Sequence, residues 1–445
     1  MSARTFRAVL QDLEMTISVS PAPSRIDQID LLRGFALLGI YWVNIVVFGL
    51  PQGAYAYPTL FGTADTYNLW IWGFSEVFVE GTMRGLFSML FGASALIFLN
   101  EVRLSGDGVV AVERFYRRNL LLMLFGITHA YLLLWHYDVL YAYGLLGLFL
   151  FPLRRLRARW LIVAGMSLLI LGEVEIDRGG HPTPAEIAAK SDKRINSAEV
   201  VLGSEESGNT SEILAEARQA MQKDIEIVQA GYWSVFFDKL SITVDQQSTW
   251  MYRNHVFDIG GMMLIGMALF KVGVFTGNCS NIVYLLLIFF GYGFAILLRS
   301  EGVLTALTEG FNAKLLRDIG DLNHDLGRLP GILGHIGMVV LLGRFTLFAR
   351  VARVLMCVGR MALTNYIAQT IISLIIFLGL GYYGLLERYQ LALLCIAIWP
   401  LQIVFSNLWL TYYRLGPLEW VWRSLIYGER QPMSLASKKP RLYPG

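Results

Sequence analysis

The chain has 445 residues, of which 55% are hydrophobic and 13% aromatic but only 16% charged, and its mean hydropathy is +0.51. Soluble globular domains are less apolar and more highly charged, so these values exclude an ordinary soluble domain and predict an integral membrane protein. The formal net charge is only +3. Membrane topology accounts for the basic residues, so we expect no nucleic-acid partner.

Apolar windows of about 19 residues, long enough to cross a hydrocarbon layer of roughly 30 Å, recur along nearly the whole chain. They are continuous runs rather than ten-residue alternations, which favours helices over a barrel. The predicted fold is therefore all-α and polytopic, with about ten transmembrane helices in one bundle. We place these helices at residues 31–50, 84–102, 118–136, 138–153, 160–176, 254–274, 281–299, 331–349, 361–381 and 391–413. The apolar segment 67–81 carries two glutamates and predicts an interfacial helix.

Arginine clusters decide the predicted orientation of the bundle. In the ten-span arrangement, the short basic loops fall on one side, which the positive-inside rule makes cytoplasmic together with both chain ends. The chain then divides into a cytoplasmic N-terminal segment, two membrane parts around an extracytoplasmic insert, and a cytoplasmic tail with an interfacial helix. The predicted boundaries are 1–30, 31–176, 177–245, 246–413 and 414–445. Roughly thirty mixed-charge residues precede the first apolar run, so no cleavable signal peptide is expected.

The insert between the fifth and sixth predicted helices is polar and carries more acidic than basic side chains. Its residues 211–232 have the periodicity of an amphipathic helix. Two interpretations of the insert remain: it caps the outer face of the bundle, or it serves as a spacer.

The stretch THAYLLLWHYDVLYAYG, residues 128–144, places two histidines and an aspartate in a run that is otherwise lipid-soluble. Ionisable groups inside a membrane segment are costly and usually line an interior cavity or a substrate path. His129 and His136 are seven residues apart, so a continuous helix would put them on one face. Asp138 beside His136 would fix the tautomer of that imidazole and raise its basicity. The alternative is a polar turn that marks the water boundary.

Other polar residues reach the same outer level in this arrangement. Arg84 opens the second predicted helix, His255 and Asp258 open the sixth, and His335 lies one turn into the eighth. They either face a common chamber or are separate helix-end residues at an interface. The three cysteines fall in two loops and one span, and they suggest neither a disulfide nor a metal site.

Five ordered stretches carry a family resemblance. They are RIDQIDLLRGFALLGIYWVNI (25–45), RGLFSMLFGASALIFL (84–99), RRNLLLMLFGITHAYLLLWHYDVLYAYGLLG (117–147), GRMALTNYIAQT (359–370) and GPLEWVWRSLIYG (416–428). With them the chain resembles the YeiB family of bacterial inner-membrane proteins over nearly its full length apart from the insert. That family in turn looks like the transmembrane acyltransferases, which include heparan-glucosaminide N-acetyltransferase.

The resemblance implies an acyl-CoA donor, such as acetyl-CoA, and an envelope or extracytoplasmic acceptor. In the bacterial sugar O-acyltransferases the first span carries an arginine, ten further residues and a histidine. Arg33 matches that arginine, but Asn44 stands at the histidine position. In the lysosomal relative that position is also asparagine and the catalytic histidine follows in the next loop, yet residues 46–58 contain none here. The family's catalytic histidine therefore has no counterpart.

Acyl transfer needs a base for the attacking group and donors for the oxyanion. We predict His136 as the base with Asp138 orienting it, Asn44 at the acceptor or oxyanion, and His255 as a reserve base. The residues predicted to bind substrate are Arg84, for an anionic group, His129, and Arg33, Arg117 and Arg118, for the phosphates of acyl-CoA arriving from the cytoplasm. Topology and anionic lipid are the alternative explanation of those last three arginines.

The predicted partners are membrane lipid and a small-molecule or glycan acceptor, with no tightly bound cofactor and with self-association left open. Two other functions stay open as well. One is a proton-coupled permease that uses the buried histidine and aspartate residues as a relay. The other is a membrane scaffold without catalysis.

Overall fold

A computed structural model describes residues 27–51, 54–55, 58, 66–104, 108–179, 210–309 and 313–435. These residues form helices and turns, with no β-strand beyond one isolated bridge between Tyr413 and Ser434. The α-helices are α2 (Asp27–Gly49), α4 (Thr66–Phe74), α5 (Thr82–Leu104), α6 (Gly108–Leu132), α7 (Leu140–Leu153), α8 (Ala158–Gly179), α11 (Thr210–Gln229), α12 (Tyr232–Gln247), α13 (Val256–Lys271), α14 (Asn281–Glu309), α15 (Ala313–Arg344), α16 (Ala349–Arg360), α17 (Ala362–Ser373), α18 (Arg388–Tyr412) and α19 (Pro417–Tyr427). Short π or 3-10 turns join some of them: η1 (Ser75–Val79), η2 (Met251–His255), η3 (Thr346–Phe348) and η4 (Leu374–Gly379).

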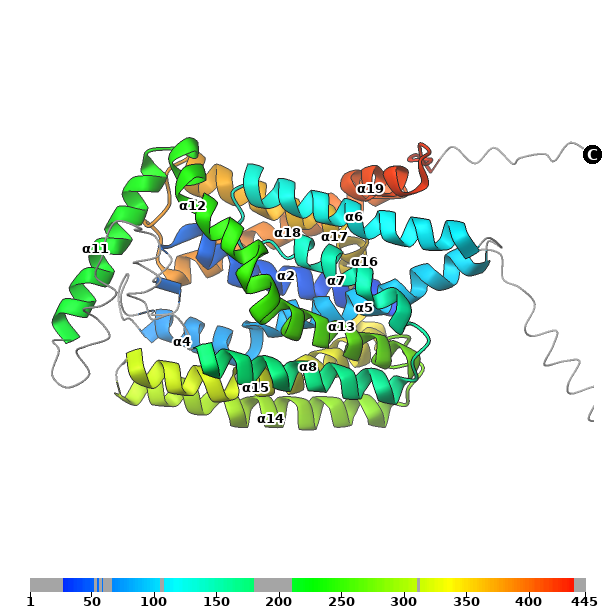
Figure 1. Cartoon of the computed structure of the whole chain (residues 1–445), viewed down its shortest axis with the longest axis horizontal. Helices are drawn as coiled ribbons and strands as arrows, with labels where there is room; N and C mark the ends of the chain where they lie inside the picture. The colour runs from blue at the N-terminus through cyan, green and yellow to red at the C-terminus, as the bar shows by residue number, and fades with distance from the viewer. Residues whose placement is uncertain are drawn as a thin grey trace, which may run out of the picture.

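The long helices lie side by side along the longest axis of the molecule, with α11 at one end and α19 at the other (Figure 1). Within the described residues, five helical segments are long and apolar enough to cross a membrane: Asp27–Gly49, Thr66–Asn100, Asn281–Thr308, Ala362–Gly379 and Arg388–Tyr412. A bent pair around Phe345 makes a sixth if it counts as one span. Helix α14 turns large apolar side chains outward, as with Phe289 at 74% exposure. The protein is an all-α integral membrane protein, and the count of ten spans stays a prediction.

Each predicted span falls on a helix, but several helices end or begin at other residues than predicted, and at two ends the helix stops earlier than predicted. The third was expected to run to residue 136, whereas α6 ends at Leu132 and Leu134 adopts a left-handed backbone conformation with a φ of 54°. The eighth was expected to run to residue 349, whereas α15 ends at Arg344. There Phe345 is extended, and the chain turns by 93° into the segment that contains α16.

The described part of the insert forms two helices joined at Gly231, whose φ of 100° favours glycine. Helix α11 confirms the amphipathic helix predicted from residues 211–232, and α12 follows it without having been predicted. The N-terminal segment up to residue 26, residues 180–209 of the insert and the tail beyond residue 435 lie outside the described residues. The interfacial position predicted for 67–81, where α4 and η1 lie, stays a prediction.

Two close helix crossings depend on glycine. A Cβ on Gly266 of α13 would lie 2.0 Å from the carbonyl oxygen of Met89 on α5, and a Cβ on Gly359 of α16 would lie 1.9 Å from that of Asp30 on α2. A side chain at either position would force the helices apart, so glycine permits backbone contact. The first crossing packs α5 against α13, the two helices that carry Arg84 and Asp258 of the charged cluster described below.

A buried carboxylate contributes to the attachment of helix α19 to the bundle. Glu419 accepts hydrogen bonds from the backbone N–H of Thr364 at 3.0 Å and from its hydroxyl at 2.5 Å. Thr364 lies in the first turn of α17, so this contact joins the end of the chain to a predicted transmembrane segment. Burial raises the pKa of Glu419, although the bonds from Thr364 act in the opposite direction.

Candidate functional site

One histidine of the 128–144 stretch, His129, contacts the aspartate of that stretch, Asp138, at the end of α6. Asp138 Oδ1 lies 2.7 Å from Nδ1 of His129, and its Oδ2 accepts the backbone N–H of Tyr141 at 2.9 Å. The His129 and Asp138 side chains are 0% and 1% exposed. The chain reverses at Leu134, and this reversal folds Asp138 back onto α6. A buried carboxylate that holds an imidazole nitrogen fixes its tautomer and stabilises its charged form.

The prediction that Asp138 orients His136 is therefore wrong, since the carboxylate binds His129. The prediction that His129 and His136 share a helix face is wrong as well, because α6 ends before residue 136. His136 lies in the connection after α6, and its Nδ1 is buried without a hydrogen-bond partner among the described residues. That ring lines a pocket instead, as described below.

The other nitrogen of His129 reaches a hydroxyl on a distant helix. Its Nε2 lies 2.8 Å from Oγ1 of Thr370 on α17, and Thr370 is 2% exposed. Many helical hydroxyls in this protein donate to a carbonyl of the preceding turn, as Ser88 does to Arg84. Thr370 makes its side-chain hydrogen bond to His129 alone among the described residues. Asp138, His129 and Thr370 thus form a chain of carboxylate, imidazole and hydroxyl, the arrangement in which an oriented base activates a hydroxyl.

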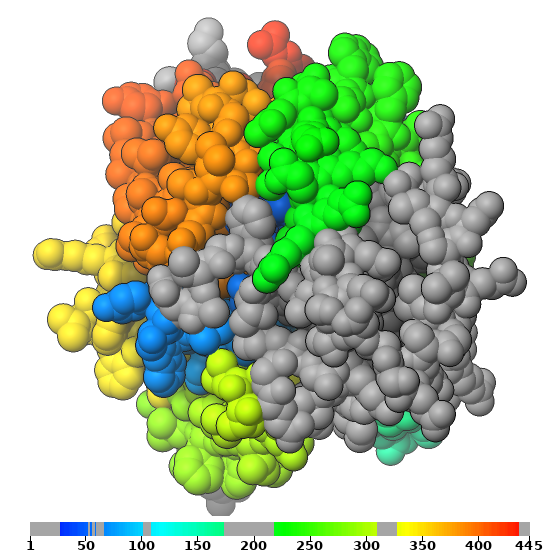
Figure 2. All heavy atoms as spheres, turned by 90° about the vertical axis from the view of Figure 1, so that its left-hand side faces the viewer, coloured from blue at the N-terminus to red at the C-terminus, as the bar shows by residue number. Residues whose placement is uncertain are grey.

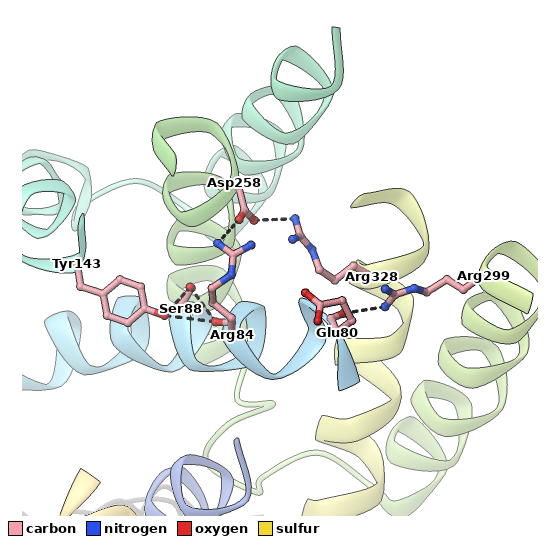
Figure 3. Close-up of polar contacts among 7 residues, drawn as sticks. All are labelled: Glu80, Arg84, Ser88, Tyr143, Asp258, Arg299 and Arg328. Atoms are coloured by element: carbon pink, nitrogen blue, oxygen red, sulfur yellow. Dashed lines mark hydrogen bonds and ion pairs between the residues drawn. The ribbon is translucent and has the colours of Figure 1, made fainter. Parts of the chain in front are cut away.

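A second buried cluster contains two arginines and one aspartate (Figure 3). Asp258 on α13 lies 2.7 Å from Arg84 on α5 and accepts a 2.7 Å hydrogen bond from Arg328 on α15. The cluster carries one net positive charge. The Arg328 side chain is 1% exposed, whereas that of Arg84 is 29% exposed. Arg84 is the member of the cluster that an anionic group can reach.

Tyr143 connects this cluster to α7. Its hydroxyl lies 2.8 Å from the hydroxyl of Ser88 and donates to the carbonyl oxygen of Arg84 at 3.3 Å (Figure 3).

His255 directly precedes α13, and its Nδ1 is buried without a partner in the described part of the chain. His335 lies elsewhere, bound to the hydroxyl of Tyr292 and the carbonyl oxygen of Phe78. Of the polar residues predicted at the outer level, the structure thus joins Arg84 with Asp258 and places His335 apart.

Arg328, Arg299 and Thr370 were missed from the sequence. The predicted eighth span began at residue 331, whereas α15 begins at Ala313 and continues through Pro330. Arg328 therefore lies inside a helix. In the same region, Arg299 on α14 donates to the carbonyl oxygen of Glu80 at 2.9 Å (Figure 3). Continuation of the helical pattern upstream of residue 331 is the signal that would have found Arg328.

Two of the three arginines predicted to bind phosphate lie on one face of α5. Arg33 on α2 binds Asp30 at 2.9 Å and also Ser94 of α5. Arg118 on α6 is 7% exposed and lies over three aromatic rings. Those rings belong to Phe91, Phe98 and Trp422. One guanidinium nitrogen of Arg118, Nη1, is buried without a hydrogen-bond partner in the described chain.

The third of these arginines, Arg117, points away from that face. It pairs with Glu113 one turn earlier and donates to the carbonyl oxygen of Ile426 on α19 at 3.3 Å. Arg117 therefore does not join Arg33 and Arg118. We refer to Arg33 and Arg118, with the α5 face between them, as the cationic site.

A pocket lies beyond the end of α2 opposite the cationic site. Its cavity volume is about 80 Å³, within a hollow of about 640 Å³ that includes space open to the outside. Figure 2 shows this end of the molecule, where atoms of the α2 region are visible between the orange segment that includes η4 and the green helices of the insert. Its lining includes Trp135, His136 and Ser373 from the bundle and Asp224 and Lys239 from the insert. The described helices of the insert thus border the pocket, which favours the cap over the spacer.

The pocket adjoins the Asp138–His129–Thr370 chain. Ser373 follows Thr370 by one turn of α17, and the indole of Trp135 donates to the hydroxyl of Tyr366, whose ring packs against His129. Asn44 lies one turn before Val47 and Phe48, which line the pocket from α2. Its side chain is half-buried and makes no hydrogen bond within the described residues.

The sequence has relatives of similar length. A family model described as a protein of unknown function (DUF418) matches residues 269–429. A protein of Escherichia coli strain K12 named Uncharacterized protein YeiB is 30% identical over 408 residues, which cover 89% of this chain and 95% of that protein. The chain belongs to the YeiB family. A second YeiB-like relative, Uncharacterized protein YxaH of Bacillus subtilis strain 168, is 26% identical over 434 residues, 93% of this chain and 97% of the relative.

No solved structure matches the chain. Membership of the YeiB family confirms the resemblance carried by the five stretches. The more distant likeness of the YeiB family to transmembrane acyltransferases stays a prediction.

Proposed function

We propose that this protein is a transmembrane acyltransferase, which moves an acyl group from acyl-CoA to a hydroxyl or amine of an acceptor on the other side of the membrane. The main support for this proposal is the enclosed chain of Asp138, His129 and Thr370, because it presents an oriented base to a hydroxyl inside an apolar bundle. The Asp138–His129–Thr370 chain lies between the cationic site, toward one end of the bundle, and the pocket, toward the other end. Each of the two ends thus offers a place for one substrate.

In the proposed reaction His129 is the general base in place of His136. The hydroxyl of Thr370 holds Nε2 in the resting state, and the acceptor takes the position of that hydroxyl. The acceptor oxygen or nitrogen attacks the thioester carbonyl as its proton passes to Nε2, and Asp138 stabilises the imidazolium. Collapse of the tetrahedral adduct breaks the carbon–sulfur bond, and the thiolate of CoA takes the proton. Asn44, with an unengaged amide, is the proposed oxyanion donor.

The donor would bind through the cationic site. Arg118 is cationic, nearly enclosed and incompletely hydrogen-bonded, which suits the phosphates of a nucleotide. Eleven positions separate Arg118 from His129 along α6, and eleven separate Arg33 from Asn44 along α2. Both intervals correspond to about 16 Å of helix axis. An elongated donor such as acyl-CoA spans such an interval, with its phosphates at one end and its thioester at the other.

This function implies an orientation. The cationic site and both chain ends would face the cytoplasm of a bacterium, with the protein in the inner membrane, and the pocket would face the envelope. The positive-inside distribution of arginines supports this orientation. The cytoplasmic and extracytoplasmic divisions at residues 30, 177, 245 and 414 belong to the same proposal. The acceptor would be a small molecule or a glycan, and membrane lipid would surround the bundle.

The direct test measures release of CoA from acetyl-CoA by the purified protein in lipid nanodiscs. The variant is His129→Ala, and the matched control is His335→Ala, since His335 is also buried and also bonded through both ring nitrogens. We expect the first variant to abolish release and the second to retain it. Loss of release in both variants, with both folded, would contradict the assignment.

A second measurement concerns the donor. Arg118→Met should weaken acetyl-CoA binding, measured as thermal stabilisation by the ligand, whereas Arg117→Met should not. Wild-type protein that shows neither binding of acetyl-CoA nor release of CoA, but takes up substrate with protons in proteoliposomes, would replace the acyltransferase by the permease. The relay of that permease would be sought in the same buried groups.

A further inference from the structure

The walls of the pocket are mostly apolar. Phe48 of α2, Val228 of α11, Val235 of α12 and Phe377 of η4 all line it. The ring of Phe48 stacks on that of Trp135 with centroids 4.0 Å apart. Pockets with such walls and a few polar groups bind ligands through a large apolar part. The occupant therefore has a hydrocarbon portion.

Helix α12 separates the pocket from the outer surface of the bundle. Val235 and Lys239 face the pocket, whereas Trp233 and Phe237 on the other side of the helix are 67% and 68% exposed. Figure 1 shows α12 running obliquely across the bundle, from the α11 end toward the middle of the molecule. Exposed aromatic side chains on a membrane protein face lipid or the membrane interface. A single helix thus lies between the pocket and the outer surface of the molecule, and its exposed aromatic side chains favour membrane lipid as the source of the occupant.

The charges around the pocket favour an uncharged headgroup over an anionic one. Lys239 Nζ lies 2.9 Å from Asp224 Oδ1 and 3.1 Å from Asp238 Oδ2. The hydroxyl of Tyr383 donates to Asp224 Oδ2 at 2.7 Å. Lys239, the one lysine or arginine of the described residues that lines the pocket, is thus already paired with two carboxylates and is not available to bind a phosphate. An uncharged group rich in hydroxyls fits instead.

His136 supplies the polar contact for such a headgroup. Its ring lines the pocket, and its buried Nδ1 has no hydrogen-bond partner in the described part of the chain. A buried polar atom without a partner is costly, and a hydroxyl of the occupant would remove that cost. Ser373 also lines the pocket, with its hydroxyl 3.1 Å from that of Tyr41.

We propose that this pocket binds one membrane lipid with an uncharged, hydroxyl-bearing headgroup, whose chain lies against Phe48 and Phe377 and whose headgroup hydrogen-bonds to His136. Binding of this lipid does not depend on the proposed function. Its role as the acyl acceptor does rest on that function. In that role a headgroup hydroxyl would be the attacking group.

The test uses quenching of Trp135 by bromine. Protein in nanodiscs is supplied with either a brominated diacylglycerol bearing a neutral sugar or a brominated phosphatidylglycerol of the same chains. The contribution of Trp135 is the difference in quenching between the wild type and Trp135→Phe. We expect saturable quenching of this contribution by the neutral lipid at a several-fold lower lipid fraction than by the anionic one. Equal quenching by both lipids, or none by the neutral lipid, would overturn the proposal.

Two substitutions on α12 provide the matched pair. Val235→Phe fills the pocket, whereas Val244→Phe adds the same group at a residue that is 50% exposed. The first should abolish the saturable component and the second should leave it unchanged. Saturable quenching that survives Val235→Phe in folded protein would contradict binding in this pocket.

The acyltransferase proposal and the lipid-site proposal can be refuted independently of each other. The quenching experiment contains no acyl-CoA, so lipid binding without release of CoA would refute the acyltransferase alone. Transfer to a water-soluble acceptor without saturable quenching would refute the lipid site alone.

Discussion

Removal of the carboxylate at Asp258 is the sharpest probe of the buried charges. Asp258 is 5% exposed and lies 2.7 Å from each of two guanidinium groups. In Asp258→Asn both arginines keep their charge but lose the carboxylate that lies between them. Loss of one partner of a buried ion pair costs about 3 to 5 kcal/mol, because the remaining charge stays out of water without compensation.

The two arginine side chains differ in their exposed fraction, and this difference predicts which of them accounts for most of the cost. The Arg84 side chain is 29% exposed, whereas that of Arg328 is 1% exposed. The charge on Arg328, whose side chain is almost fully enclosed, therefore accounts for most of the cost. We expect Arg328→Met in the Asp258→Asn background to recover about 2 kcal/mol or more, since an apolar group of similar volume replaces the buried cation. Arg84→Met in the same background should recover much less.

The assay is thermal unfolding of the detergent-solubilised protein, followed by intrinsic fluorescence together with retention of a monodisperse elution profile. The Asp258→Asn protein should melt well below the wild type, and the double variant with Arg328→Met should lie between them. Equal recovery by both double variants would show that exposure does not decide the cost. A wild-type melting temperature for Asp258→Asn would refute the placement of this carboxylate between two cations.

Three further predictions concern catalysis, packing and pH. Asp138→Asn, which preserves size but removes the charge that stabilises the imidazolium, should lower release of CoA from acetyl-CoA by roughly 10³-fold or more without loss of folding; an unchanged rate would exclude the Asp138–His129 pair from the reaction. Gly266→Ala should destabilise the protein by about 1 to 3 kcal/mol because its methyl group meets the Met89 carbonyl, whereas Gly293→Ala, with nothing within 4 Å, should stabilise it by up to about 1 kcal/mol in the same melting assay; equal effects would contradict the close crossing. Because burial raises the pKa of Glu419 above its ordinary value of 4.5, the stability it contributes is complete below pH 4.5 and is lost as the pH rises through the raised pKa; Glu419→Gln should remove that part of the pH dependence of the melting temperature, and an unchanged profile would refute it.

Most helices were predictable from the sequence because a bilayer leaves the backbone few options. An apolar run in lipid must satisfy its own hydrogen bonds, so a run of sufficient length predicts a helix. The 128–144 stretch was also recognisable, since ionisable residues in such a run need a reason. Which carboxylate meets which imidazole was not predictable. Asp138 has histidines two and nine residues before it, and only the turn at Leu134 decides in favour of His129.

Helix α12 was missed because hydropathy counts each charge separately. Asp238 and Lys239 lower the mean hydropathy of residues 232–247, so the segment was assigned to the polar insert. In the structure Lys239 lies within ion-pair distance of Asp224 and Asp238, and the exposed side of the helix is aromatic. Charges that compensate each other cost far less to bury than isolated ones. Pairing between α11 and α12 is a tertiary contact that no sequence window contains.

The turn at Leu134 connects the two parts of the proposed site. A leucine with a φ of 54° costs about 1 to 2 kcal/mol relative to a helical residue, and extension of α6 by one more turn would avoid that cost. The reversal places Asp138 against His129 and leaves Trp135 and His136 in the pocket lining. A turn that only marked the water boundary would need none of these contacts. Unfavourable backbone conformations persist where the surrounding structure fixes them, and they concentrate at functional sites. The same strained residue thus positions the base and forms part of the pocket, which favours one catalytic unit over two unrelated features.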